Sequence, residues 1–122
     1  MFSKSNTAGK HMICDFKNII NTELLNNKDS LQEICRNICY HNHYDILGET
    51  EKVFEPHGFT FLFLLGESHL SLHTFPERNY IAFDLYTCRE YTNDNVYHNI
   101  FIYLKNILDA ETSEIKIIDR CF

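Results

Sequence analysis

The sequence Gly66-Glu67-Ser68-His69-Leu70-Ser71-Leu72-His73-Thr74-Phe75-Pro76-Glu77 lies near the middle of the chain, and the elements around it are organised by it. It follows an apolar run at residues 61–65, which is typical of a buried strand. Its two leucines alternate with His69, Ser71 and His73, which is the period of a strand with one apolar and one polar face. Hydroxyl, imidazole and carboxylate groups this close together can support nucleophilic or acid–base chemistry.

Length and composition limit the class of protein. A chain of 122 residues is expected to form a single domain over 1–122, and 44% hydrophobic residues are enough for a core. The formal charge of −6 argues against a nucleic-acid partner, because phosphate binding needs clustered Lys and Arg. No apolar run is long enough for a membrane span, so we expect no membrane partner.

The chain start and the cysteines predict a cytoplasmic protein. Residues 1–9 are small and polar without the apolar core of a signal peptide, and we expect them to form a mobile tail. The five cysteines are odd in number and irregularly spaced, which fits reduced thiols better than a disulfide framework.

The remaining sequence predicts six strands and two helices. The first helix is expected over Ser30–His41, with Ser30 as N-cap and Glu33 completing a capping box, and the second is expected to start at Thr92-Asn93-Asp94. The expected strands are 11–16, 44–54, 59–65, 68–74, 80–88 and 114–119. This order lacks an alternating βαβ rhythm and predicts an α+β two-layer sandwich, a mostly antiparallel sheet with two helices on one face.

A group of Cys35, Cys39, His41 and His43 could be read as metal ligands. Both cysteines fall on the apolar stripe that the helix needs for the core, and no second ligand pair follows at the usual spacing. We therefore expect buried cysteines that fill the core and no metal site.

The central motif resembles the self-cleavage motif of the S-adenosylmethionine decarboxylases, specifically the short prokaryotic-type proenzymes. The likeness is carried by Glu67-Ser68-His69-Leu70, His73-Thr74 and Pro76-Glu77, and by a following segment, Tyr80–Cys88, which ends in a cysteine as the family's strand does. It extends from about residue 9 to residue 119 and so covers nearly the whole chain. The fold known for this family is the two-layer sandwich that the pattern also predicts.

The resemblance implies that the chain makes its own cofactor. Ser68 Oγ is expected to attack the carbonyl of Glu67 and convert the peptide bond to an ester. Elimination then cuts the chain between Glu67 and Ser68 into fragments 1–67 and 68–122, and residue 68 becomes a pyruvoyl group. That group serves as the electron sink for decarboxylation, so neither a metal nor pyridoxal phosphate is expected.

The resemblance also assigns catalytic roles to three more residues. His73, five residues after Ser68, matches the histidine that assists processing, and Thr60 stands where this class usually has a serine. Cys88, twenty residues after Ser68, matches the cysteine that returns a proton to the substrate carbon.

Two residues match the family's substrate contacts. Phe54 matches an aromatic residue that stacks on adenine, and Glu77 matches an acid that binds ribose hydroxyls. Phe75 stands where the family commonly has tryptophan. Core packing is the alternative role for Phe54 and Phe75.

The predicted function is therefore pyruvoyl-dependent decarboxylation of S-adenosylmethionine for spermidine biosynthesis, by a homodimer with sites near its interface. Two alternatives stay open. One is a pyruvoyl decarboxylase of the same fold that acts on arginine or ornithine. The other is an unprocessed binding or regulatory homologue that never forms the pyruvoyl group.

Overall fold

The structure, a computed structural model, describes residues 6–122 and consists of one six-stranded sheet with helices packed on it. The sheet order is β2-β3-β4-β5-β1-β6, and every neighbouring pair is antiparallel. The strands are β1 (Thr7–Ile19), β2 (Ile46–Val53), β3 (Phe59–Leu65), β4 (Ser68–Phe75), β5 (Tyr80–Thr87) and β6 (Ala110–Cys121). The helical elements are α1 (Thr22–Leu25), α2 (Lys28–His41), η1 (Pro76–Arg78) and α3 (Asn95–Leu108).

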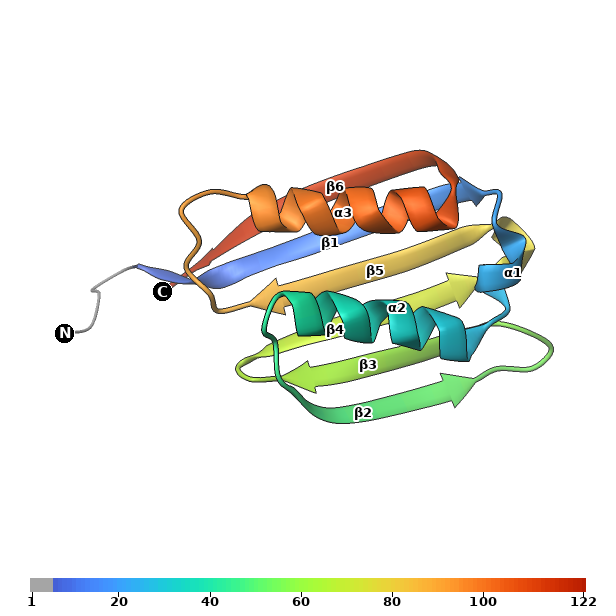
Figure 1. Ribbon diagram of the computed structural model, residues 1–122, viewed down its shortest axis with the longest axis horizontal. Helices are drawn as coiled ribbons and strands as arrows, with labels where there is room; N and C mark the ends of the chain where they lie inside the picture. Colours follow the sequence, from blue (N-terminus) through green and yellow to red (C-terminus); the bar gives the residue numbers. More distant parts are fainter. Residues whose placement is uncertain (1–5) are drawn as a thin grey trace.

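The two long helices, α2 and α3, lie on one face of the sheet and leave the other face without a helix (Figure 1). The core lies between these layers. Strand β3 supplies Phe59, Phe61, Phe63 and Leu65 to it at alternate positions, and all four are buried. The predicted α+β two-layer sandwich is thus confirmed.

Strand β4 has the two faces that its sequence predicts. Leu70 and Leu72 are buried in the core beneath the helices. His69, Ser71 and His73 occupy the intervening positions, and they therefore point to the opposite face of the sheet. We call this second, helix-free surface the open face.

Several predicted boundaries are wrong. The N-cap of α2 is Asn27, whose side chain accepts a hydrogen bond from the Ser30 N–H, so Ser30 is already inside the helix. Residues 7–9 of the expected mobile tail belong to β1, while residues 1–5 lie outside the described part of the chain. Strands β1 and β6 are longer than predicted, and β2 is shorter than 44–54.

The cysteines of α2 behave as the sequence predicts. Cys35 and Cys39 are buried among the core residues, and burial raises the pKa of the Cys39 thiol to about 11. Thiols buried in this way stay neutral and act as small apolar groups.

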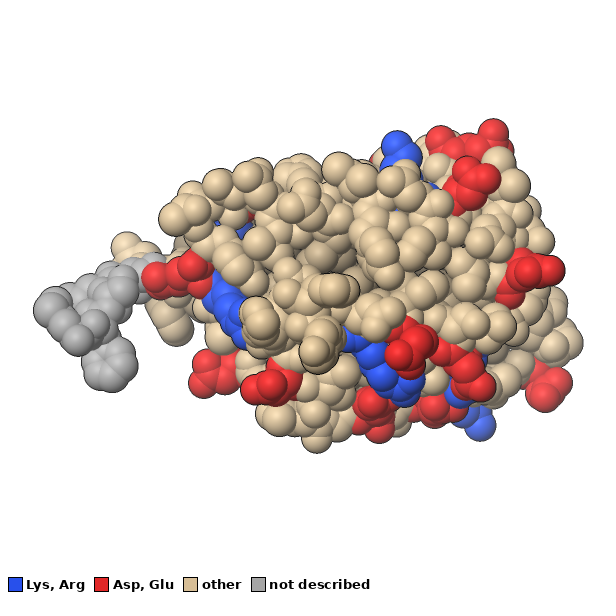
Figure 2. All heavy atoms as spheres, in the orientation of Figure 1, with Lys and Arg blue, Asp and Glu red and all other residues tan. Residues whose placement is uncertain are grey.

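Charged side chains form no extended basic field on the helix-covered side of the described residues. Figure 2 shows acidic groups scattered around its rim with few basic ones between them. Between residues 6 and 122, no helix is both long and apolar enough to cross a membrane.

Candidate active site

Ser68 lies at the first position of β4, directly after the two-residue turn that joins it to β3. The turn residue Glu67 has φ of 54°, a left-handed conformation that costs energy for a residue with a side chain. The Ser68 hydroxyl accepts a hydrogen bond from the Cys88 backbone N–H at 3.3 Å, and Cys88 Sγ lies 3.5 Å from Glu67 Oε2. The fold therefore brings both sides of the Glu67–Ser68 peptide bond next to Cys88, Ser68 to its backbone and Glu67 to its thiol.

The segment that carries Cys88 is held from both sides. The buried Thr87 hydroxyl is hydrogen-bonded to the Tyr97 hydroxyl of α3 at 2.7 Å. Arg89 donates hydrogen bonds to the backbone carbonyls of Asn42 and His43, just after α2. These contacts fix the position of Cys88 after β5 ends, because one of its sequence neighbours is tied to α3 and the other to the segment that follows α2.

A second cluster lies further along the same strands, on the open face. Thr60 of β3 and His73 of β4 are register partners, and Thr60 Oγ1 lies 2.8 Å from His73 Nδ1. The Thr60 hydroxyl and the His73 imidazole are therefore within hydrogen-bonding distance of each other.

The predicted substrate residues join this second cluster. Phe54, Thr60, His73 and Glu77 all line one pocket of about 360 Å³. Phe54 is 47% exposed, so it lies outside the buried core. Such a pocket, with an aromatic face and a carboxylate, can take a small ligand with a planar ring and hydroxyl groups.

Two further side chains shape the pocket. His57 Nε2 forms an ion pair with Glu77 Oε2 at 3.0 Å, in which the histidine is charged only when protonated. Phe75 stacks on Tyr80 with ring centroids 5.5 Å apart, and it is 39% exposed. Phe75 therefore supports the pocket wall rather than filling the core.

The two clusters are far apart within one chain. Ser68 and His73 are five residues apart on one strand, a distance of about 17 Å at the usual rise per residue. Their positions differ by an odd number, so their side chains also point to opposite faces. The structure brings Ser68 together with Cys88, and Thr60 together with His73, but it does not bring these pairs together.

Comparison with known families decides the relationship. The family model described as S-adenosylmethionine decarboxylase matches residues 10–121. The chain belongs to the S-adenosylmethionine decarboxylase family. The match includes both clusters, so each candidate residue lies inside the shared domain.

Relatives named as members of this family align over most of this chain. It is 36% identical to S-adenosylmethionine decarboxylase proenzyme 2 of Bacillus cereus, over 93% of this chain and 89% of that protein. It is 30% identical to the S-adenosylmethionine decarboxylase proenzyme of Thermosipho africanus, over 86% of this chain and 78% of that protein.

A solved structure of the adenosylmethionine decarboxylase of Aquifex aeolicus superposes with a TM-score of 0.81. It covers 97% of this chain and 94% of its own at 21% sequence identity, so this likeness supports the fold.

Sequence reasoning about this family member missed one group of polar side chains. His11, His69 and Asp84 converge on the open face from β1, β4 and β5. Alternation along each strand could place them on one face, but it could not reveal that β1 inserts between β5 and β6. Only this long-range pairing brings His11 to Asp84.

Proposed function

We propose that this chain is a self-processing decarboxylase of S-adenosylmethionine that uses a pyruvoyl group derived from Ser68 and serves spermidine biosynthesis. The observation that carries the proposal is the contact between Ser68 and Cys88 beside the strained residue Glu67. Family membership supports the substrate, and the names of the relatives as proenzymes support the processing.

The residues around the Glu67–Ser68 bond suit an internal cleavage. Ser68 Oγ attacks the Glu67 carbonyl carbon, its proton is removed, and the acyl group moves from the Ser68 nitrogen to the oxygen. The left-handed conformation of Glu67 raises the energy of the uncleaved turn and so favours its opening. Elimination releases the Glu67 carboxylate, and hydrolysis of the resulting dehydroalanine releases ammonia and leaves the ketone.

The ketone, once formed, supplies an electron sink by covalent reaction with the substrate amine. The chain's own groups fit this position. Cys88 lies beside residue 68, and its thiol is proposed to deliver a proton to the substrate carbon after carbon dioxide leaves. Its fixed neighbours, Thr87 and Arg89, keep the thiol at that distance.

The pocket of the second cluster is proposed to bind the nucleoside part of the substrate. Phe54 offers a half-exposed aromatic face for a purine, and Glu77 offers acceptors for the two ribose hydroxyls. Thr60 and His73, in the same pocket, are proposed to act in processing through their hydrogen-bonded pair.

These roles require two chains. The reacting group and the pocket lie about 17 Å apart on opposite faces of one sheet, so one chain does not form the complete site. A homodimer with two-fold symmetry can supply the Ser68 cluster from one protomer and the Thr60–His73 cluster from the other. The open face supports such pairing, because Leu62, Leu64 and Ile118 are exposed on it, and Ser68 stands at the end of β4, where a partner chain on that face can reach past the edge of the sheet.

The function is tested by measuring carbon dioxide release from carboxyl-labelled S-adenosylmethionine, arginine and ornithine on fully processed protein. We expect release from S-adenosylmethionine. Release from an amino acid alone would overturn the substrate and leave the pyruvoyl chemistry in place. If intact-mass measurement finds only the full-length chain, the protein is instead an unprocessed binding or regulatory homologue that forms no pyruvoyl group.

The proposed compartment is the cytoplasm. All five cysteines are free, although Cys35 and Cys39 are close neighbours on one helix. Unpaired thiols of this number persist in a reducing environment.

A further inference from the structure

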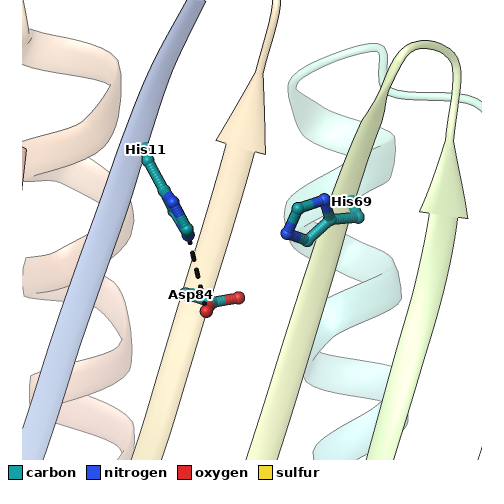
Figure 3. Close-up of side chains that lie close together, drawn as sticks. All are labelled: His11, His69 and Asp84. Atoms are coloured by element: carbon teal, nitrogen blue, oxygen red, sulfur yellow. Dashed lines mark ion pairs between the residues drawn. The ribbon is translucent and has the colours of Figure 1, made fainter. Parts of the chain in front are cut away.

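The open face carries a polar cluster outside both halves of the proposed site. His11 of β1 and His69 of β4 are both register partners of Tyr86 on the intervening strand β5. Their backbones are therefore two strand spacings apart, about 9.5 Å. Figure 3 shows the two rings leaning from either side over β5, which carries Asp84.

The distances among the three side chains are short enough for a shared ion. One ligand atom from each of His11, His69 and Asp84 lies within 4.8 Å of the others. A tetrahedral zinc ion with bonds of about 2.1 Å holds its ligand atoms about 3.4 Å apart. His11 Nε2 and Asp84 Oδ2 are already 3.4 Å apart. His69, whose side chain is exposed, has to move by at most about 1.4 Å to bring its ligand atom from 4.8 Å to the tetrahedral spacing.

The surroundings orient the ligands. The Ser71 hydroxyl donates a hydrogen bond of 2.6 Å to Asp84 Oδ1, which leaves Oδ2 directed at His11. The His69 ring stacks on Tyr86, with centroids 5.9 Å apart. Outer partners of this kind fix the geometry of metal ligands.

One atom of the cluster makes no hydrogen bond to any described residue, and its contact with Asp84 at 3.4 Å is an ion pair only when the ring is protonated. His11 Nε2 is buried and, among the described residues, makes no hydrogen bond. A buried ring nitrogen without a hydrogen bond loses free energy relative to water, and coordination to a cation compensates that loss. This observation points to a ligand independently of the spacing.

We propose that His11, His69 and Asp84 form a binding site for a divalent transition metal ion such as Zn²⁺. Two neutral imidazoles and one carboxylate are a donor set that zinc accepts, and three protein ligands leave a position for water. Because the ligands come from three adjacent strands, the ion ties β1, β5 and β4 together on the open face. Mg²⁺ is a poor fit, since it prefers oxygen ligands.

The test is calorimetric titration of the full chain with Zn²⁺, on a Cys121→Ser background that removes the most exposed thiol. We expect saturable binding of one ion per chain and no competition from excess Mg²⁺. Asp84→Asn and His69→Gln should each weaken binding at least about tenfold, because even outer partners of metal ligands cost that much. Zn²⁺ should raise the Tm of the parent chain and not of Asp84→Asn.

The matched control is His57→Gln, because it removes the other histidine–carboxylate pair, with Glu77. Its Zn²⁺ affinity should equal that of the parent. Co²⁺ in place of Zn²⁺ should give a visible spectrum without thiolate charge transfer. Three results would each overturn the proposal and leave a simple His11–Asp84 ion pair. They are the absence of saturable Zn²⁺ binding, an unchanged Zn²⁺ affinity in folded Asp84→Asn and His69→Gln, and a Co²⁺ spectrum with thiolate charge transfer.

Discussion

The Ser68 hydroxyl accepts a hydrogen bond from the Cys88 backbone N–H across twenty residues of sequence. The contact forms because β4 and β5 are neighbours with Ser68 at the start of one and Cys88 just past the end of the other. The group expected to become the electron sink and the group expected to deliver the proton are thus joined by the hairpin itself.

The first prediction concerns cleavage. Purified protein should separate into fragments 1–67 and 68–122, and Ser68→Ala should stay intact because no hydroxyl remains to attack. Ser71→Ala is the matched control and should still be cleaved, since its hydroxyl lies on the other face and binds Asp84. Intact-mass spectrometry distinguishes these chains. A wild-type chain that stays whole after prolonged incubation would contradict the enzyme function.

A mixing experiment tests the shared site. His73→Ala is expected to block or slow processing, and Cys88→Ala is expected to process but to lose productive decarboxylation. Coexpression of the two variants should restore activity at about a quarter of sites, because random pairing gives one intact site in each mixed dimer. If both clusters acted within one chain, every site would lack one group and coexpression would restore nothing.

The position of Cys88 depends on Gly9. Gly9 has φ of 135°, and a Cβ there would lie 2.1 Å from the Thr87 carbonyl oxygen. Gly9→Ala should therefore lower the free energy of unfolding by about 1–3 kcal/mol and reduce turnover by shifting the neighbouring thiol. Gly66→Ala is the control, because nothing lies within 4 Å of its added Cβ. Equal Tm values for the two variants in thermal unfolding would refute this account.

The sequence predicts the features that depend on neighbouring residues better than those that depend on side-chain geometry or on contacts between distant segments. The alternation of Leu70 and Leu72 with His69 and His73 predicted both faces of β4, because strand geometry is local. The N-cap was misassigned to Ser30, since the choice between it and Asn27 depends on side-chain geometry. The separation of Ser68 from His73 follows from the rise per residue of a strand. The two residues are close in sequence, so the motif by itself does not show that their side chains are far apart in space.

Buried thiols predict an alkaline loss of stability. Burial, with smaller contributions from Asp15 and Asp84, raises the pKa of Cys14 from 9.0 to about 12. Between these values the unfolded chain has released the proton and the folded chain retains it, so the free energy of unfolding falls as pH rises above 9. The free energy of unfolding is measured by urea titration at several pH values between 8 and about 11. Its decrease with pH should be shallower in Cys14→Ala than in the parent, by up to about 1.4 kcal/mol per pH unit. The exposed thiol variant Cys121→Ala should keep the parent slope, and an unchanged slope in Cys14→Ala would refute the assignment.

The last prediction separates substrate binding from packing at Phe54. If its half-exposed ring stacks on a purine, Phe54→Ala should raise KM for S-adenosylmethionine by about 5- to 150-fold, which corresponds to 1–3 kcal/mol per stacked base. The Tm should change little, because the ring lies outside the core. Val53→Ala truncates a neighbour of similar exposure, 53% against 47%, and should leave KM unchanged. An unaltered KM together with a lowered Tm would instead make Phe54 a packing residue, and the nucleoside pocket would have to be sought elsewhere.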